Sequence, residues 1–350
     1  MKKDIKSLTL KELQDEMGLI GEAKFRAGQI YRWLHVKYAD DFSDMTDLSE
    51  NLRVKLKENY DIVGVRQVKK LVSKEDNTTK YLFEIENNYI IESVFMRYSY
   101  GNTMCVSTQA GCRMGCAFCA STIGGVEKSL SPSEMLSQIY EAEKDMGEKV
   151  SHVVLMGSGE PLDNYDNVMK FIRILNSKEG KNMSQRHITL STCGLINKMY
   201  DLADEDLQIT LAVSLHAPND AIRNEIMPVS KANPMDKLLE ACRFYAEKTK
   251  RRVTFEYSLI KGVNDSAQNA KELASKLKGM LCHVNLIPVN DVKERNFVRS
   301  SNETVKMFEE ILTSRGIEAT VRRKLGSDID AACGQLRKRY KDEMMRSDRK

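Results

Sequence analysis

The amino-acid sequence predicts an α/β fold built on a parallel sheet, preceded by a small helical segment and a β-rich connector. After Gly101, short apolar runs alternate with amphipathic stretches of helical period, and this repetition favours a parallel sheet. Residues 61–100 alternate apolar and polar positions, as antiparallel strands do. Residues 1–60 space their leucines at helical intervals.

The first 60 residues are expected to form short helices. SLTLKELQDEMGL (7–19) places a serine cap before a leucine periodicity, and AKFRAGQIYRWLHVKY (23–38) has apolar, aromatic and basic residues at helical spacing. Tyr31 and Trp33 are interpreted as helix-packing residues rather than as stackers for nucleic-acid bases. In the connector, Asp76-Asn77 and Asn87-Asn88 predict turns between strands.

Seven apolar runs beyond Gly101 are expected strands: 104–108, 152–157, 187–192, 209–215, 253–259, 283–290 and 318–323. Five amphipathic helices are expected between them: 131–146, 164–177, 233–250, 266–279 and 301–316. Several of these begin with a Ser, Asn or Asp cap. Six or seven strands in about 220 residues suit a partial (β/α) barrel or a doubly wound sheet. In a barrel, the active site is expected at the carboxyl ends of the strands.

Composition limits the classes of function. The 350 residues carry 54 basic and 50 acidic side chains, a net charge of +4, so any basic surface must be local. No apolar run predicts a membrane span, and the basic start MKKDIKSLTLKEL lacks the apolar run of a signal peptide. The protein is therefore expected in the cytoplasm and away from membranes. Its eight cysteines then favour ligands or catalysts over a disulfide framework.

The segment AGCRMGCAFCAS (110–121) places Cys112, Cys116 and Cys119 within eight positions, just after the first expected barrel strand. A structural zinc site needs four ligands, and the next cysteine downstream is Cys193. Zinc is therefore the less favoured interpretation. Iron–sulfur clusters also use compact cysteine runs, and a four-iron cluster held by three thiolates leaves one iron open to another ligand.

Polar residues follow four of the later expected strands at their carboxyl ends. The run HVVLMG leads into GSGEP (157–161), whose glycines let the backbone approach a ligand closely. Ser191, then Ser214 with His216, and then Asn290 stand at the later strand ends. Each of them alone could cap a helix or turn the chain. Polar residues at four such strand ends together favour a binding site.

The C-x3-C-x2-C spacing, with Phe118 before the last cysteine, resembles the signature of the radical S-adenosylmethionine (radical SAM) superfamily. CVSTQAGC, GEPLDNYDNV, SLHAPND, DIDAACGQL and KFRAGQIYRWLH together resemble the RlmN family of dual-specificity RNA methyltransferases over essentially the whole chain. The resemblance implies a partial (β/α)6 barrel of radical SAM type at 101–325. It also implies an RNA-contacting helical domain at 1–60, a β-hairpin connector at 61–100, and a C-terminal loop with a basic tail helix at 326–350.

The resemblance also implies the cofactors and the residues that serve them. The cofactors would be a [4Fe–4S] cluster and S-adenosyl-L-methionine, two molecules per turnover. The cluster ligands would be Cys112, Cys116 and Cys119. Cys333 would carry the methyl group, Cys105 would be the resolving cysteine and Glu92 the general base. The cofactor contacts would be Gly159, Glu160, Ser191, Ser214, Leu215, His216 and Asn290.

The implied reaction is methylation of adenine carbon 2 in 23S ribosomal RNA, at the peptidyl-transferase centre, and in transfer RNA next to the anticodon. Carbon 2 lies between two ring nitrogens and is too electron-poor to attack a sulfonium methyl group. In the implied relay, the Cys333 thiolate takes a methyl group by displacement, and a radical then removes hydrogen from it. The methylene radical adds to the ring, Glu92 takes the ring proton, and Cys105 attacks Cys333 to leave a transient disulfide.

An RNA partner has support beyond the resemblance, since basic residues flank the Cys333 loop: Arg322, Arg323, Lys324, Arg337, Lys338 and Arg339. Such a cluster would attract a phosphate backbone, although a solvated basic helix is the commoner meaning of a charge run. A flavodoxin- or ferredoxin-like electron donor and a monomeric state are also expected. Two alternatives stay open: a Cfr-type enzyme acting on carbon 8 of the same adenine, and a non-catalytic RNA-binding protein with a structural cluster or zinc.

Two positions depart from the usual pattern of the family. Ser158 stands in GSGEP where methionine is general, and Cys193 stands in STCG where serine is frequent. The GSGEP motif is expected to act mainly through its backbone, so Ser158 puts little in doubt. Cys193 lies two residues from the expected contact Ser191, and its role is left open.

Overall fold

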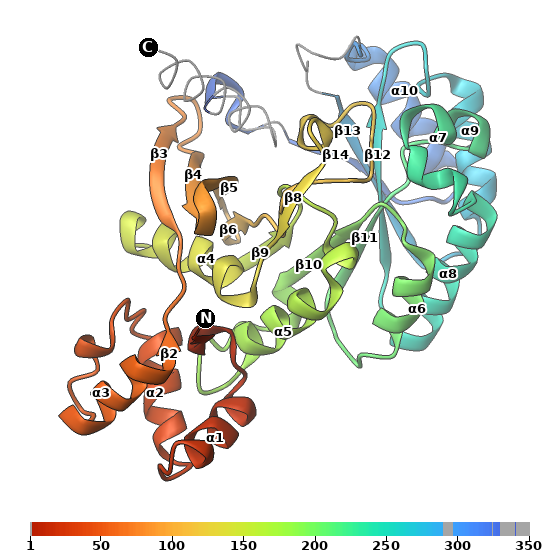
Figure 1. Ribbon diagram of the computed structural model, residues 1–350. Coiled ribbons are helices and arrows are strands. Elements are labelled where there is room, and N and C mark those ends of the chain that lie inside the picture. The colour runs from red at the N-terminus through yellow and green to blue at the C-terminus, as the bar shows by residue number, and fades with distance from the viewer. Residues whose placement is uncertain (1, 290–296, 324, 330–339, 341–350) are drawn as a thin grey trace.

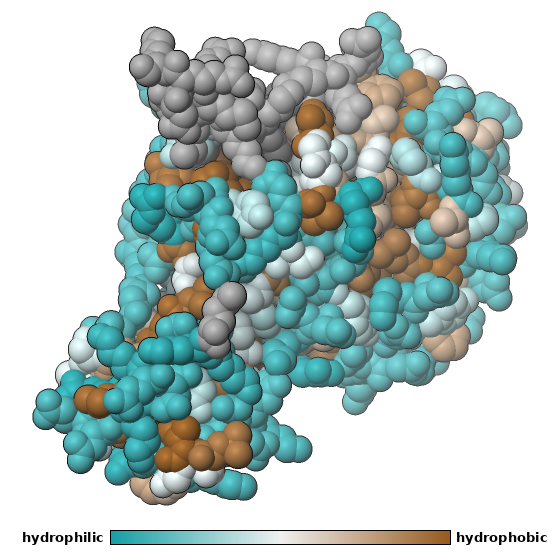
Figure 2. Space-filling model, in the orientation of Figure 1, coloured by the Kyte–Doolittle hydropathy of each residue, from teal (hydrophilic) through white to brown (hydrophobic). Residues whose placement is uncertain are grey.

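The computed structural model describes residues 2–289, 297–323, 325–329 and 340 (Figure 1). The N-terminal residues form a lobe of three helices: α1 (Leu10–Leu19), α2 (Arg26–His35) and α3 (Glu50–Asn59). Thr9 and Glu12 begin α1 with a reciprocal capping box. The short strands β1 (Lys3–Asp4) and β2 (Tyr60–Asp61) pair in parallel beside the helices. This lobe projects from the body of the protein (Figure 2).

The body is organised around one ten-stranded sheet with the order β14-β13-β12-β11-β10-β9-β6-β5-β4-β3. Its parallel part contains β6 (Gly101–Cys105), β9 (His152–Leu155), β10 (Ile188–Thr192), β11 (Thr210–Ser214), β12 (Val253–Leu259), β13 (Cys282–Pro288) and β14 (Ala319–Val321). The antiparallel part contains β3 (Arg66–Val72), β4 (Thr79–Ile85) and β5 (Tyr89–Tyr98). A separate hairpin joins β7 (Gln109–Gly111) to β8 (Val126–Ser129).

Helices cover the outer face of the parallel strands (Figure 1). They are α4 (Pro132–Met146), α5 (Tyr165–Asn176), α6 (Ile196–Ala203), α7 (Asp220–Ile226), α8 (Met235–Thr249), α9 (Ala267–Leu277) and α10 (Asn302–Ser314). The sequence reading did not include α6 and α7. Both are short, with eight and seven residues, and so offer too few turns for a clear helical period.

The alternation of side chains along each strand separates the core from the barrel interior. On β11, Leu211 and Val213 are fully buried in the core shared with the helices, while Thr210 and Ser214 are only half-buried. Successive strand residues point to opposite faces of a sheet, so Thr210 and Ser214 lie on the other, inner face. The same pattern on β10 places Ile188 and Leu190 in the core and Ser191 on the inner face.

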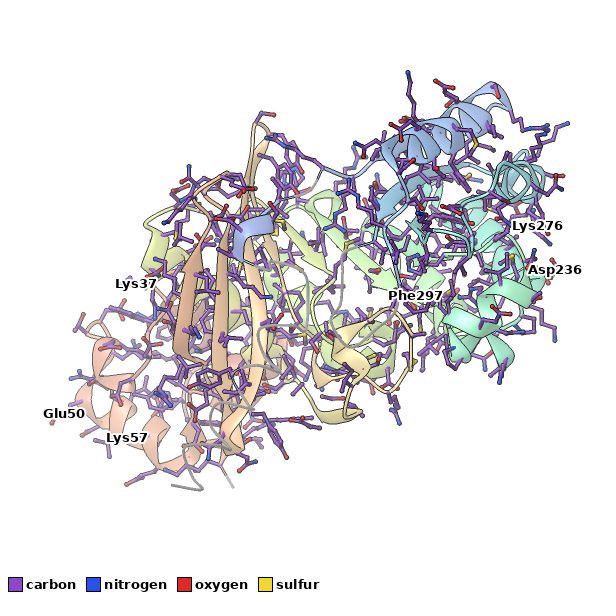
Figure 3. The ribbon with its side chains drawn as sticks, turned by 90° about the horizontal axis from the view of Figure 1, so that it is seen from above. Lys37, Glu50, Lys57, Asp236, Lys276 and Phe297 are labelled. Carbon is purple, nitrogen blue, oxygen red and sulfur yellow. The ribbon has the colours of Figure 1, made fainter. Side chains whose placement is uncertain are left out.

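The predicted partial barrel, helical N-terminal segment and β-rich connector are confirmed. The sheet is open, with β14 and β3 at its two edges. The connector strands continue the barrel sheet, because β5 pairs in an antiparallel manner with β6. Seen from above, the helical lobe with Glu50 and Lys57 lies at one end of the molecule (Figure 3). Helices α8 and α9, with Asp236 and Lys276, lie at the other end, and Phe297 lies between the two ends. Within the described ranges, no helix is both long enough and apolar enough to cross a membrane.

Candidate active site

The loop after β7 carries three thiols and is held by backbone contacts. Cys112 N donates to Gly125 O at 3.0 Å, and Ala117 N donates to Ile226 O at 2.8 Å, which ties the loop to the end of α7. Gly111 has φ of 87°, and a Cβ there would lie 2.0 Å from Gly125 O. Only glycine fits at this position, next to the first thiol.

The three thiols face a common space. Cys112, Cys116 and Cys119 each lie within electrostatic range of the other two. Burial raises the pKa of Cys112 to about 12 and the pKa of Cys116 still further. In the described part of the chain, no three His, Cys, Asp or Glu side chains converge as ligands of one metal ion. A cluster is bound through separate iron atoms, so thiols that share a space without meeting at one point fit a cluster.

The space is enclosed by apolar side chains. Cys116, Met114 and Phe118 pack against a buried group formed by Cys193, Ile226, Met227, Ile260 and Val289. The Phe118 ring meets the His216 ring edge-on, with centroids 4.8 Å apart. These contacts give the thiol loop an apolar side, while Cys116 and Cys119 stay partly exposed; the apolar surroundings of an iron–sulfur centre tune its potential.

The GSGEP loop after β9 packs on the chain that leads to the thiols. A Cβ on Gly159, where φ is 107°, would lie 2.7 Å from Gln109 N, so the close backbone approach here is to the protein itself. Ser158 is buried, its N–H donates to Ser107 Oγ, and its Oγ accepts from Gly111 N at 3.2 Å. Serine at position 158, where the family generally has methionine, therefore adds a side-chain hydrogen bond to Gly111, next to Cys112.

Glu160 joins two strand ends. Its carboxylate accepts from Leu162 N at 3.0 Å and from Cys193 N at 2.7 Å, which links the end of β9 to the end of β10. Burial raises the pKa of this carboxyl. Cys193 is itself buried, and burial next to Glu160 raises its pKa well above the ordinary value. Cys193 is therefore a neutral thiol that packs beside Cys116.

The end of β11 brings the other expected contacts to the same region. Ser191 and Ser214 are half-buried on the inner face, whereas the side chain of Leu215 lies in the core. His216 adopts φ of 55° and is buried, and burial lowers its pKa to about 3. Its Nδ1 accepts from Ser258 N at 2.9 Å, so the neutral ring carries its proton on Nε2.

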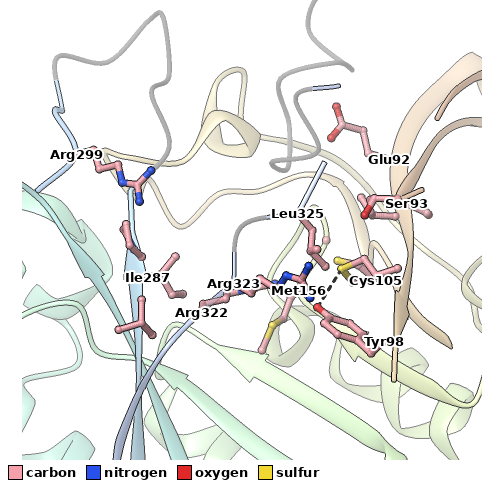
Figure 4. Close-up of a pocket in the computed structure, with 16 residues that line it drawn as sticks. Glu92, Ser93, Tyr98, Cys105, Met156, Ile287, Arg299, Arg322, Arg323 and Leu325 are labelled. Atoms are coloured by element: carbon pink, nitrogen blue, oxygen red, sulfur yellow. Dashed lines mark hydrogen bonds between the residues drawn. The ribbon is translucent and has the colours of Figure 1, made fainter. Parts of the chain in front are cut away.

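A second cavity, of about 290 Å³, lies beside this region and contains both Glu92 and Cys105 (Figure 4). Arg299 comes from the opposite wall, and Arg322 and Arg323 also line the space. Burial raises the pKa of Cys105 to about 11, an effect that Arg322 partly offsets.

The cavity meets the thiol region at the end of β9. Met156 and Gly157 line it and lead directly into the GSGEP loop. A Cβ on Gly157 would lie 2.6 Å from Ser107 N, so the loop packs tightly on the chain beyond β6. The cavity and the thiol space therefore share one strand end.

Glu92 forms an ion pair that the sequence reading did not include. Lys80 Nζ lies 3.0 Å from Glu92 Oε2, and both side chains are buried. Sheet register places Lys80 opposite Val94 and Val94 opposite Cys105, so the three stand in one row on one face. The sequence offered a signal only for Glu92, which stands between Ile90 and Val94 on one face of β5; the face of β4 that carries Lys80 also carries Glu84.

Arg223 is the other residue of this region that sequence reasoning missed. It is fully buried, and it donates to the backbone carbonyls of Cys193, Ser214, Leu215 and Asn233. In HAPNDAIRNE it follows an Asn cap and has the appearance of a surface residue on a short helix. No local pattern distinguishes it.

The chain that precedes the Cys333 loop is anchored at the turn between β3 and β4. Asp328 Oδ1 accepts from Ser73 Oγ at 2.6 Å, and Asp328 Oδ2 accepts from Lys74 N at 2.8 Å. Gly326 N donates to Asp76 Oδ2 at 2.8 Å. Cys333 and Asn290, two of the residues expected at the site, lie outside the described residues.

The site residues within the described ranges thus fall into two adjoining groups. Cys112, Cys116, Cys119, Gly159, Glu160, Ser191, Ser214, Leu215 and His216 surround the carboxyl ends of the parallel strands. Glu92 and Cys105 line the neighbouring cavity with three arginines. The first group lies at the edge of the sheet where a barrel is expected to carry its active site.

Comparison with known proteins gives the family. Residues 106–274 match the model of the radical SAM superfamily, and residues 3–62 match that of the ribosomal RNA large subunit methyltransferase N-terminal domain. A probable dual-specificity RNA methyltransferase RlmN from Clostridium novyi (strain NT) is 54% identical over 338 residues, 97% of this chain and 98% of its own. The chain belongs to the RlmN family. The resemblance read from its motifs is thereby confirmed.

Further relatives agree with this assignment. A probable dual-specificity RNA methyltransferase RlmN from Lachnoclostridium phytofermentans is 54% identical over 98% of this chain and 96% of its own. The crystal structure of a radical SAM methyltransferase from Sphaerobacter thermophilus matches with a TM-score of 0.90 at 43% identity, over 95% of this chain and 98% of that one. Membership of the radical SAM superfamily implies a [4Fe–4S] cluster and S-adenosylmethionine, and the enclosed thiols fit such a cluster.

Proposed function

We propose that the protein methylates carbon 2 of adenine in 23S ribosomal RNA, at the peptidyl-transferase centre, and in transfer RNA next to the anticodon. The observation that carries this proposal is the cavity that holds Glu92 and Cys105 together with Arg299, Arg322 and Arg323. A base, a thiol and three cations suit a nucleotide whose ring must lose a proton and whose phosphates need neutralising. Membership of the RlmN family supplies the reaction class.

The cluster would be held by Cys112, Cys116 and Cys119. When bound, it supplies the electron that cleaves S-adenosylmethionine to methionine and the 5′-deoxyadenosyl radical. The neighbouring strand ends would hold this cofactor through Gly159, Glu160, Ser191, Ser214, Leu215, His216 and Asn290. Because Nδ1 of His216 accepts a hydrogen bond, its Nε2–H is available as a donor to the cofactor. The apolar side chains packed around Phe118 limit the access of water to the radical.

Three residues of the chain would carry the chemistry on the base. The Cys333 thiolate takes a methyl group from a first S-adenosylmethionine by displacement, and its S-methyl carbon, after loss of a hydrogen atom to the radical, bonds to adenine carbon 2. Glu92 removes the proton from that carbon, and the adduct gives up its unpaired electron, which the oxidised cluster would accept, so that the ring regains its aromatic, closed-shell form. Cys105 then attacks the Cys333 sulfur, and the carbon–sulfur electron pair leaves with the new methyl carbon, which takes up a proton. Two molecules of S-adenosylmethionine are thus consumed per turnover, and an external thiol must reduce the disulfide.

The decisive experiment is mass spectrometry of nucleosides from ribosomal and transfer RNA treated with the reconstituted protein, S-adenosylmethionine and a reductant. We expect 2-methyladenosine. 8-Methyladenosine would assign the carbon-8 activity of a Cfr-type enzyme instead. RNA without methylation, in a preparation that forms no 5′-deoxyadenosine, would favour a binding protein with a structural cluster.

The remaining parts of the proposal concern partners and organisation. We propose a flavodoxin- or ferredoxin-like electron donor, a monomeric cytoplasmic protein, and an RNA contact made by the helical lobe of residues 1–60. The turn between β3 and β4 supports a role for residues 326–350 near the cavity, because it holds Gly326 and Asp328. Removal of residues 1–60 should weaken binding of transfer RNA in a filter-binding assay more than it changes 5′-deoxyadenosine formation.

A further inference from the structure

Arg223 occupies an unusual position at the carboxyl ends of the strands. Its side chain has no exposed surface. Nη2 donates to Cys193 O at 2.8 Å and to Ser214 O at 3.3 Å, and Nε donates to Leu215 O at 3.2 Å. Nη1 donates to Asn233 O at 3.2 Å. One guanidinium thus joins the ends of β10 and β11 to the loop before α8.

All of these acceptors are neutral carbonyls. Within the described part of the chain, Arg223 forms no ion pair with a carboxylate. Asp220, on the same helix, accepts instead from Met235 N at 2.9 Å and acts on Arg223 only from a longer range. Burial of a cation costs several kcal/mol, and proteins meet this cost with a partner of opposite charge. Among the residues that the structure describes, none provides that partner at contact distance.

The thiol space lies beside this cation. Arg223 holds the carbonyl of Cys193, and the side chain of Cys193 packs with Cys116 in one apolar group. Cys116 and Cys193 both lie within electrostatic range of the guanidinium. Because the guanidinium is buried and Cys116 lies within its electrostatic range, an anion bound at the thiols would interact with Arg223 more strongly than two charges do in water.

We propose that Arg223 is the countercharge of the iron–sulfur cluster and raises its reduction potential, while it fixes the two strand ends around the cofactor. A cluster bound by three thiolates is an anion, and it becomes more negative when it accepts an electron. A fixed buried cation therefore stabilises the reduced form more than the oxidised form. Arg223 is a positioning residue in this role, because its hydrogen bonds go to carbonyls and none of its described contacts is with a thiol. The inference requires the cluster and is independent of the RNA substrate.

The test compares variants that separate charge from hydrogen bonding. Arg223→Gln keeps an amide donor and loses the charge, Arg223→Met loses both, and Arg223→Lys keeps the charge without the planar fork. The midpoint potential of the reconstituted cluster is measured by redox titration with electron paramagnetic resonance, in the absence of RNA. We expect the equilibrium constant for reduction to fall at least tenfold in both neutral variants, about 59 mV for a one-electron couple. Arg223→Lys should stay within threefold of the wild type.

Arg251→Gln is the matched control. Arg251 Nη2 contacts Thr210 Oγ1 at 3.3 Å, at the opposite end of β11, so its loss should leave the potential unchanged. Neutral variants with the wild-type potential would overturn the proposal, even if their cluster content fell. If the neutral variants assemble no cluster, assembly in Arg223→Lys supports the need for a charge. If Arg223→Lys also assembled no cluster, the Arg223 side chain would be needed for packing rather than for its charge, and the proposal would be overturned.

Discussion

Lys80 Nζ and Glu92 Oε2 form a buried ion pair at 3.0 Å between the neighbouring strands β4 and β5. The ammonium group of Lys80 gives the buried carboxyl group of Glu92 a partner of opposite charge at contact distance. The pair also lies on the sheet face that carries Cys105. The Lys80 ammonium group therefore interacts with both Glu92 and Cys105.

The first prediction concerns the energy of this pair. Lys80→Met should lower the free energy of unfolding by about 3–5 kcal/mol, because it removes the cation that is paired with a buried carboxylate. The double variant Lys80→Met, Glu92→Gln should recover most of this loss, since neither buried group is then charged. Urea denaturation of the cluster-free protein measures both effects.

The exposed pair Lys276–Asp236, at 3.2 Å, provides the control. Lys276→Met should change the unfolding free energy by less than about 0.5 kcal/mol, as surface pairs contribute little. Additive effects of the two substitutions at Lys80 and Glu92 would contradict a stabilising contact between these side chains.

The second prediction concerns the resolving thiol. Cys105→Ala should accumulate a covalent protein–RNA adduct, because nothing then attacks the Cys333 sulfur, whereas Cys333→Ala should give neither adduct nor methylated RNA. Denaturing gel electrophoresis with labelled RNA detects the adduct. Cys282→Ala is the control, since Cys282 begins β13 at the end of the barrel away from the cavity. Normal turnover by Cys105→Ala would remove Cys105 from the mechanism.

How far the sequence could predict this site depends on the range of the interactions. The thiols, the GSGEP loop and the serines at the strand ends lie in compact motifs beside clear strand patterns, so their residues and their common edge were predicted. Lys80 and Glu92 are twelve positions apart and meet only through the register of β4 and β5. The register of two paired strands depends on which face of each strand is buried. The alternation of apolar and polar residues marks that face within one strand, but it does not show how the strand aligns with its neighbour.

Arg223 was beyond prediction for a different reason. Its four acceptors are backbone carbonyls, which every residue possesses, so no side-chain pattern marks the position. The short helices α6 and α7 were missed because packing against the barrel stabilises them more than their own periodicity. Long-range packing therefore decided the elements and residues that the sequence reading did not include.

The third prediction uses the raised pKa of Cys105, about 11. Only the thiolate reacts, and below that pKa its fraction rises tenfold per pH unit. Alkylation of Cys105 by iodoacetamide should therefore increase about tenfold per unit from pH 7 to 10. Arg322 lowers this pKa, so Arg322→Met should slow alkylation at every pH in that range. Peptide mass spectrometry of the cluster-free protein follows the reaction. A plateau below pH 9 would contradict the burial of the thiol.

The fourth prediction concerns stability and pH at His35, which α2 buries completely against Tyr140. Burial lowers its pKa to about 3, whereas in the unfolded chain it titrates near pH 6.5. Its contribution to stability is therefore complete above about pH 6.5 and is lost as the pH falls towards 3. His35→Gln should flatten the fall in unfolding free energy between pH 6 and 5 by about 1.4 kcal/mol per unit. Between pH 7 and 8 the two curves should run parallel in urea titrations.

The fifth prediction concerns the anchor of the C-terminal chain. Asp328 accepts from Ser73 Oγ and Lys74 N, and these contacts fix the chain five residues before Cys333. Asp328→Ala should lower the rate of Cys333 methylation several-fold, because the chain that leads to Cys333 is no longer held at the turn between β3 and β4. Formation of 5′-deoxyadenosine in the absence of RNA should be unchanged, since the substitution does not alter the loop that carries Cys112, Cys116 and Cys119. Asp236→Ala, at an exposed carboxylate on α8, is the control. Equal losses in both assays would show that the anchor supports the whole fold rather than the placement of Cys333.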